Sequence, residues 1–281
     1  MTAVWLVLAL LPLGLLFGGL LGCWRRWRHR RIAAAPFPPD WERVLMARWL
    51  MYRRLPEALR QRLRERLRLF LAEKNFIPCA GLEMSEEMPL LIAAQACLLV
   101  AHRPLPPYPA LHSILLYPAA YLADTEHWDE AGVVSSGQEA RLGESWEGGQ
   151  VVLGWEQVAA DLAEPDDAHN VVLHEFAHQL DHDDGLADGL PVLPESGMYR
   201  RWGALFSEAW EDLQRQLQAG EPTLLDPYAA TDPAEFFAVL VETFFEQPHP
   251  LAAENPPLYT LLTEYFALDP REWQPLLDAH R

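Results

Sequence analysis

The pattern of apolar and polar residues changes character along this chain. Residues 1–24 carry no charged side chain, and an apolar stretch runs from Ala3 to Leu21. Beyond residue 41 the apolar positions recur mainly at the three- and four-residue spacing of helices, with short continuous apolar runs between them. The pattern predicts an apolar N-terminal segment followed by a mixed domain in which helices predominate.

The pattern from residue 41 onward is typical of an α+β domain that is mostly helical and has a small sheet. Short strands are expected at Leu111–Tyr117 and Gly148–Trp155, the second after a turn-rich stretch from Gly132 to Glu147. Two helices broken near Pro56 are expected between Trp41 and Phe70. Further helices are expected at Ser85–Val100, Ala168–Asp183, Glu195–Ala219, Pro233–Gln247 and Glu254–Leu268.

The apolar segment has the length of a membrane span, which needs about 20 apolar residues. The run RRWRHRR, Arg25–Arg31, follows it directly, and arginine beside a span is retained on the cytoplasmic side. We therefore expect residues 1–24 to form a single transmembrane anchor in the cytoplasmic membrane, with the rest of the chain facing the cytoplasm. A cleaved export signal would carry its positive charge before the apolar run. Two alternatives stay open: lipoprotein processing at Cys23, and a buried or interfacial helix.

Charge divides the chain of 281 residues further along, after residue 72. Residues 1–72 carry 14 arginines and four acidic residues, a balance of +10, whereas residues 73–281 have a balance of −28. An acidic main body repels phosphate, so direct nucleic-acid binding is not expected. We expect a basic, Pro-rich linker at residues 25–40, then a domain over residues 41–281 whose first part, 41–72, is basic and helical.

One helix of the basic part is amphipathic. Its apolar residues Leu59, Leu63, Leu67 and Phe70 share a face, and five arginines crowd the rest, namely Arg60, Arg62, Arg64, Arg66 and Arg68. These arginines either contact anionic lipid headgroups or form a solvated face that complements the acidic body. The three cysteines include no CxxC pair, which argues against a disulfide scaffold and against a cysteine-ligated metal.

The segment Asn170–Asp181 contains His-Glu-x-x-His within a helical pattern. His174 and His178 are four residues apart, so on a helix both imidazoles lie on one face and can bind one ion. Zinc is the metal that such a site usually takes. Glu175 is then placed to act as the general base toward a water at that ion. The alternative is an ordinary buried helix with two hydrogen-bonded histidines.

A third ligand is expected from a downstream helix that starts at Pro233. Glu235 lies in its first turn, directly before two phenylalanines that would draw it inward, and a buried carboxylate needs a partner. A glutamate that merely faces the helix dipole is the alternative. Glu242, seven residues on and on much the same face, is a rival ligand, whereas Glu246 and Glu254 are interpreted as surface residues. Asp181 is a candidate acceptor for the ring N–H of a ligand histidine.

The segments Asn170–Asp181 and Leu225–Glu246 resemble the Mlc titration factor A family of bacterial zinc peptidases, as do Phe76–Val100 and Gly143–Trp155. That family is itself similar to the catalytic domain of anthrax lethal factor. The resemblance covers roughly residues 70–250 and implies a zincin-like metallopeptidase fold. It also implies that one zinc ion is held by His174, His178 and Glu235, with Glu175 as the catalytic base. Tyr228, seven residues before Glu235, corresponds to the tyrosine that faces the developing oxyanion in this arrangement.

The resemblance indicates a zinc-dependent peptidase of the gluzincin type. Its substrate would be a peptide or protein, bound as an extra strand along a sheet edge. Gln150–Trp155 is our candidate for that edge, with an internal strand as the alternative. Members of the family are also linked to a transcriptional repressor, so a regulatory protein that sequesters such a partner is the alternative function. Partner binding should survive Glu175→Gln, whereas hydrolysis should not.

Overall fold

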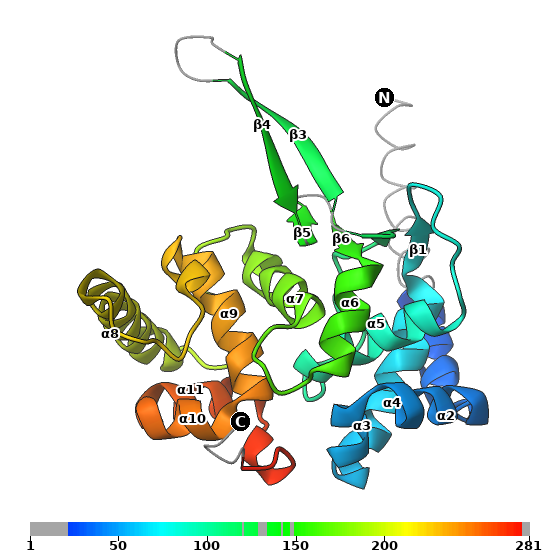
Figure 1. The fold of residues 1–281 in the computed structure, drawn as a ribbon. Coiled ribbons are helices and arrows are strands. Elements are labelled where there is room, and N and C mark those ends of the chain that lie inside the picture. Colours follow the sequence, from blue (N-terminus) through cyan, green and yellow to red (C-terminus); the bar gives the residue numbers. More distant parts are fainter. Residues whose placement is uncertain (1–21, 120, 129–133, 142, 147–148, 277–281) are drawn as a thin grey trace, which may run out of the picture.

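The computed structural model in Figure 1 describes residues 22–119, 121–128, 134–141, 143–146 and 149–276. Residues 22–34 are helical. The following helices are α2 Pro39–Arg48, α3 Leu50–Arg54, α4 Glu57–Glu73, α5 Glu87–Leu99, α6 Trp155–Ala163, α7 Val171–Asp181, α8 Met198–Ala219, α9 Pro233–Glu246, α10 Pro248–Glu254 and α11 Pro256–Phe266. Short 3₁₀ turns are η1 His182–Asp184, η2 Pro227–Ala230 and η3 Pro270–Glu272. The strands are β1 Asn75–Pro78, β2 Ser113–Tyr117, β3 Tyr121–Trp128, β4 Val134–Arg141, β5 Gly143–Trp146 and β6 Gln150–Gly154.

The main sheet has the strand order β1-β2-β6-β5. Strands β1, β2 and β6 are parallel, and β5 runs antiparallel to β6. The predicted strand over Gln150–Trp155 is therefore internal, and its interpretation as the edge of the sheet was wrong. The edge on that side is β5, in a stretch that the sequence had indicated as turns. Its four residues offer too short an apolar pattern to be recognised, and main-chain pairing with β6 defines it as a strand.

Strands β3 and β4 form a separate antiparallel hairpin. Figure 1 shows this hairpin standing away from the body of the molecule, above the level of the main sheet. Helix α6 directly follows β6, and like α10 and β1 it was not predicted. The predicted strands at Leu111–Tyr117 and Gly148–Trp155 correspond to β2 and β6, and the fold is the mostly helical domain with a small sheet that the pattern indicates.

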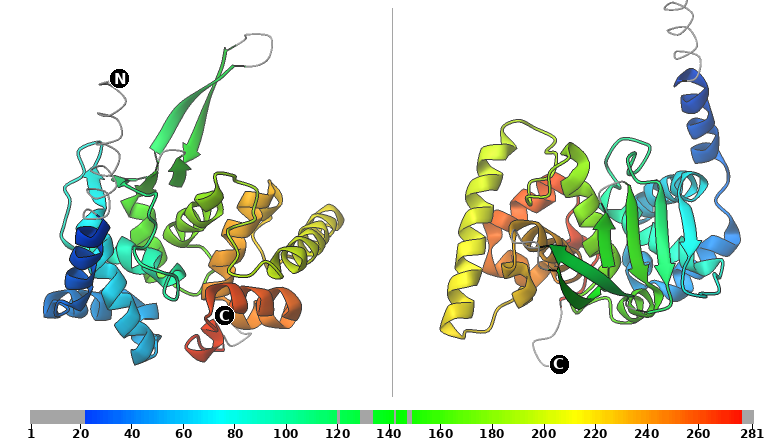
Figure 2. Two further views of the ribbon diagram at one scale, coloured as in Figure 1. Left: turned by 180° about the vertical axis from the view of Figure 1, so that it is seen from behind. Right: turned by 90° about the horizontal axis from the view of Figure 1, so that it is seen from above.

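Helix α7 lies at the centre of the fold. It packs against α9, α5, α6 and the edge strand β5. The C-terminal helices α8–α11 lie on one side of it, and the sheet with α2–α6 lies on the other, as the views of Figures 1 and 2 agree. Buried residues from both sides form one continuous hydrophobic core. The helix with the His-Glu-x-x-His motif is therefore braced from both sides.

The N-terminal part is more helical than expected. Residues 22–34 are helical, so most of the predicted linker over residues 25–40 is helix. Only the short Pro-rich break before α2 is non-helical. The predicted break near Pro56 separates α3 from α4, and an additional break occurs at Trp49. Trp49 has an extended backbone conformation at this break, and its side chain is buried.

The arginines of α4 are largely engaged within the protein. Arg64 pairs with Glu42 and Glu57 at 2.8 and 2.7 Å. Arg66 is buried, and its guanidinium donates to the carbonyl oxygens of Val100 and Arg103 at 2.8 and 2.7 Å. These contacts favour the interpretation in which the helix complements the rest of the domain over one in which it contacts lipid.

The predicted membrane anchor falls on residues 1–24, and residues 1–21 lie outside the described part of the chain. Among the described helices, none combines the length and the apolar character that a membrane crossing requires.

Candidate metal centre

Helix α7 carries the two motif histidines. Asn170 caps it, because the Asn170 Oδ1 accepts a hydrogen bond from the Leu173 N–H at 3.0 Å. The apolar face is fully buried, with Val172, Leu173, Phe176, Ala177 and Leu180 at 1% exposure or less. His174 and His178 lie one turn apart at the margin of this face, and their side chains keep 15% and 11% exposure. Packing of the apolar face therefore turns both imidazoles toward the same partly open position.

Helix α9 brings the third predicted ligand. Its first turn is capped by Asp232, whose Oδ1 accepts from the main-chain N–H groups of Ala234 and Glu235, both at 2.9 Å. Phe236 and Phe237 are buried directly after it. Their burial fixes the rotation of α9, so the Glu235 carboxylate points across to α7 and keeps 18% exposure.

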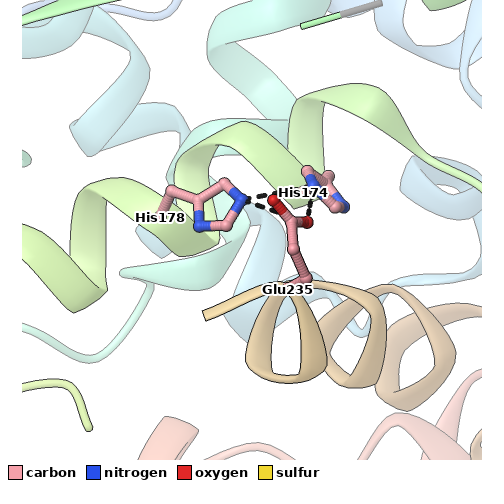
Figure 3. A group of neighbouring side chains, drawn as sticks. All are labelled: His174, His178 and Glu235. Carbon is pink, nitrogen blue, oxygen red and sulfur yellow. Dashed lines mark hydrogen bonds and ion pairs between the residues drawn. The ribbon is translucent and has the colours of Figure 1, made fainter. Parts of the chain in front are cut away.

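The three predicted ligands meet in one cluster, shown in Figure 3. The Glu235 Oε2 lies 3.0 Å from the His174 Nε2 and 3.6 Å from the His178 Nε2. The two Nε2 atoms are 3.2 Å apart. Ligand atoms about 2.0–2.1 Å from a tetrahedral zinc ion are separated by about 3.3 Å, so the spacing fits that geometry. Two imidazole nitrogens and a carboxylate oxygen are also the donor set that zinc accepts.

The electrostatics of the cluster favour a cation. Burial acts to lower the pKa of His174, but hydrogen bonds to Glu235 and Glu242 outweigh it and raise that pKa well above its ordinary value. Burial acts to raise the pKa of Glu235, but the two histidines lower it well below its ordinary value. The Glu235 carboxylate therefore stays charged, and the negative charge beside His174 favours a cation there, either a proton on the ring or a metal ion.

The two predicted catalytic residues flank the cluster. Glu175 follows the first ligand on α7 and is 4% exposed. Tyr228 lies in η2, where Asp226 caps its main-chain N–H at 2.7 Å, and its ring centroid is 6.3 Å from that of His174. Burial, together with the charge and hydrogen bond of Glu235, raises the pKa of Tyr228 to about 12. The phenol is thus a proton donor at neutral pH, on the open side of the cluster, with 54% exposure.

Several neighbours differ from their predicted places. The rival ligand Glu242 lies behind His174, where its Oε1 is 2.8 Å from the Nδ1. Glu246 is 1% exposed, so its interpretation as a surface residue was wrong, because α9 is enclosed on all sides. Asp181 accepts from the Gly189 N–H at 2.9 Å, a loop contact in place of the expected histidine.

Two further residues of the buried surroundings were not predicted from the sequence. Asp161 accepts from the Val171 N–H at 2.8 Å, and burial raises its pKa to about 6. Gln95 accepts from the Asn170 Nδ2 at 2.8 Å. An asparagine directly before an apolar run is a helix-start signal, so the sequence could have predicted that Asn170 caps α7. The contacts of Asp161 and Gln95 have no such signal.

Comparison with known proteins shows which family this chain resembles. Residues 24–267 match the family described as "Glucose-regulated metallo-peptidase M90". The chain is 41% identical over 248 residues to a protein of Synechocystis sp. that is described as uncharacterized, covering 88% of this chain and 90% of the relative. It is 34% identical over 250 residues to Mlc titration factor A of Cronobacter sakazakii, covering 87% and 91%. The protein of the same name from Serratia proteamaculans is 36% identical over 205 residues, covering 71% and 76%.

The match includes the basic helices that precede the sheet. The expected extent of the resemblance, about residues 70–250, was therefore too narrow. The helix over residues 22–34 falls almost entirely within the shared region as well.

Proposed function

The chain belongs to the M90 family of glucose-regulated metallopeptidases, and from that premise we propose that it is a zinc-dependent, zincin-like peptidase of the gluzincin type. The observation that carries the proposal is the convergence of His174, His178 and Glu235 on one point from two helices. One zinc ion bound there would polarise the scissile carbonyl and activate a water for attack on it.

The residues around the ion divide the remaining chemistry. Glu175 accepts the proton of the attacking water and returns it to the leaving amine, as a general base and then a general acid. Its position supports this role, because Glu175 directly follows the ligand His174 on α7 and is 4% exposed. The Tyr228 hydroxyl donates a hydrogen bond to the developing oxyanion, which would lower the barrier by about 2–4 kcal/mol.

The substrate is a peptide or protein segment in extended form. Strand β5 pairs with β6 on one side, and no other described strand pairs with its second side. It also contacts α7, the helix of the cluster. A peptide added to β5 would gain main-chain hydrogen bonds and run beside the two histidines.

We place the enzyme at the bacterial inner membrane, with the catalytic domain facing the cytoplasm. The support is the uncharged stretch Ala3–Leu21 and the arginines that follow it. Full-length protein should remain with the membrane fraction after an alkaline carbonate wash, and deletion of residues 1–21 should release it. Recovery of the full-length protein in the soluble fraction would contradict this placement.

A second candidate function is binding of a transcriptional repressor. The relatives named Mlc titration factor A favour it, because that name describes titration of Mlc. On this proposal an Mlc-like repressor binds the folded domain, and hydrolysis is secondary. Since binding needs no proton transfer, Glu175→Gln should abolish hydrolysis and leave repressor binding unchanged.

The test of the main proposal is zinc content and peptide hydrolysis of the full-length protein and two variants. Wild type should hold one zinc ion per chain. Glu175→Gln should keep the zinc and lose about 10²–10⁴-fold in kcat, because only the proton acceptor is removed. Glu235→Ala should lose most of both zinc and activity.

Glu254→Gln is the matched control, since Glu254 is exposed at the end of α10. It should behave as wild type in both measurements. Stoichiometric zinc without cleavage of any peptide in a broad library would favour the repressor-binding function. A wild-type protein without zinc would overturn the proposed metal site.

A further inference from the structure

A buried carboxylate stands directly behind one of the predicted zinc ligands. Glu242 is 5% exposed and lies on α9, two turns after Glu235. Its Oε1 is 2.8 Å from the His174 Nδ1, and its Oε2 accepts a hydrogen bond from the main-chain N–H of Asn170. Both oxygens of the carboxylate are therefore used, one by the histidine ring and one by the cap of the same helix.

This contact determines which ring nitrogen of His174 is available to a metal. A carboxylate only accepts hydrogen bonds, so the Nδ1 must carry the proton that it shares with Glu242. The Nε2, which faces Glu235 and His178, is then the ring nitrogen left to bind a metal ion in place of a proton. Helix α9 thus holds the ring from behind while it supplies Glu235 from the front.

Glu242 is itself held in place by the junction of three helices at Asn170. The Asn170 side chain donates to Gln95 on α5 at 2.8 Å and to Glu246 on α9 at 2.9 Å, while its Oδ1 caps α7. These bonds orient the main-chain N–H of Asn170 toward Glu242. Asn170 is 3% exposed, so these bonds are shielded from bulk solvent.

We propose that Glu242 is a positioning residue of the zinc site. The main-chain N–H of Asn170 holds its carboxylate, and the carboxylate fixes the tautomer and orientation of His174. The inference rests on the proposed zinc site. The Glu242 carboxylate also balances charge. Glu235 and Glu242 together carry two negative charges, which match the two positive charges of a zinc ion bound by two neutral imidazoles. Partners of this kind typically change metal affinity by about 10- to 100-fold.

The test compares the zinc affinity of full-length wild type and Glu242→Gln by competition with a chelator at constant pH. A glutamine has one acceptor oxygen, so it can satisfy either the His174 N–H or the Asn170 N–H but not both. The dissociation constant should rise about 10- to 100-fold. Glu254→Gln is the control for the substitution itself, because Glu254 is exposed at the end of α10 and is not part of the junction at Asn170. It should leave zinc affinity unchanged.

A second pair of variants addresses the junction. Asn170→Ser keeps a capping side chain but loses the bonds to α5 and α9, and should weaken zinc binding to a smaller extent than Glu242→Gln. Asn255→Ser makes the same change at the cap of α11, where Asn255 accepts from the Leu258 N–H at 3.1 Å, and should have no effect on zinc.

A spectroscopic readout separates positioning from a merely structural role. In zinc-loaded wild type with ¹⁵N-labelled histidine, His174 should show metal on the Nε2 and a strongly downfield proton on the Nδ1. That proton resonance should shift upfield in Glu242→Gln. Zinc on the Nδ1 in wild type would overturn the inference even if the variant failed to fold.

The outcomes also distinguish this inference from the proposed function. Tight zinc binding by wild type and an unchanged affinity in Glu242→Gln would overturn the positioning role alone. Absence of zinc from wild type would overturn the zinc site and this inference with it. A rise in the dissociation constant confined to Glu242→Gln and Asn170→Ser would support it.

Discussion

Gly189 lies against the main chain of Pro233 so closely that a Cβ at Gly189 would stand 2.3 Å from the Pro233 carbonyl oxygen. The φ angle of Gly189 is +74°, in the left-handed region. Its N–H donates to Asp181 at the end of α7, and its carbonyl oxygen accepts from the Trp202 Nε1 at 3.0 Å. The loop after α7 is thereby fastened to the first turn of α9, two residues before Glu235. This contact sets the spacing between the helices that carry the metal cluster.

Gly189→Ala should lower the free energy of unfolding by about 3 kcal/mol, of which roughly 1 kcal/mol is backbone strain and the rest steric overlap. Zinc affinity should fall as well, since α9 must shift to accommodate the methyl group. Chemical denaturation and chelator competition measure the two effects. Gly220→Ala is the control, because its φ of +68° is similar but no atom lies within 4 Å of the added Cβ. Equal losses in the two variants would contradict the role of the contact.

Tyr228→Phe should lower kcat by about 10²–10³-fold with little change in zinc affinity, because it removes the hydroxyl that donates to the oxyanion and keeps all three metal ligands. Since the side chain is 54% exposed, the free energy of unfolding should change by less than about 0.5 kcal/mol. Tyr199→Phe provides a comparison, with a phenol that is 41% exposed and accepts from the Leu193 N–H. Full activity of Tyr228→Phe would remove Tyr228 from the catalytic residues.

Asp181 should make the stability of the metal-free protein depend on pH. Burial raises its pKa from 3.8 to about 6. Between these values the folded protein binds a proton that the unfolded chain has released, so the free energy of unfolding falls as pH rises from about 4 to about 6 and this contribution is constant above. Asp181→Asn keeps an acceptor for the Gly189 N–H and has no charge to bury. It should be more stable than wild type by about 1–2 kcal/mol at pH 7.5, and the difference should vanish near pH 4.

Urea denaturation across this pH range, with a chelator present, tests that expectation. Asp184→Asn is the control, since Asp184 is exposed in the same region and accepts from the Leu186 N–H at 3.0 Å. It should follow the wild-type pH profile. A constant difference between Asp181→Asn and wild type at all pH values would show that the charge of Asp181 is not responsible.

Arg54→Lys should lower the free energy of unfolding by about 1–2 kcal/mol, because lysine cannot reproduce a bidentate contact. Arg54 donates to both oxygens of Asp166, at 2.5 and 3.0 Å, and to the Gln274 Oε1 at 2.6 Å. It therefore joins the N-terminal helices to the segment before α7 and to the end of the described chain. Arg53→Lys changes the exposed neighbour and should leave the urea midpoint unchanged. Equal midpoints for the two variants would contradict this role.

The spacing of residues along the chain was sufficient to predict those parts of the site that lie within a single helix. The histidines of a His-Glu-x-x-His helix lie one turn apart in any helix, so His174 and His178 could be paired from the sequence. The caps of α7 and α9, and the burial of Phe236 and Phe237, follow from the same short-range rules. The choice of Glu235 over Glu242 needed the family resemblance in addition, since both lie on much the same face of one helix.

Only the tertiary structure decided the contacts between segments that are distant in sequence. Glu242 meets the Nδ1 of His174 across 68 residues, and Asn170 meets Gln95 across 75. Strand β5 is the sheet edge because β6 pairs with β2 on its other side. Such contacts depend on how helices and strands pack, and the apolar periodicity of each segment is compatible with several packings. Glu246 was misplaced for this reason: a glutamate near the end of a helix is typical of a solvated face, and only the packing of the surrounding helices buries it.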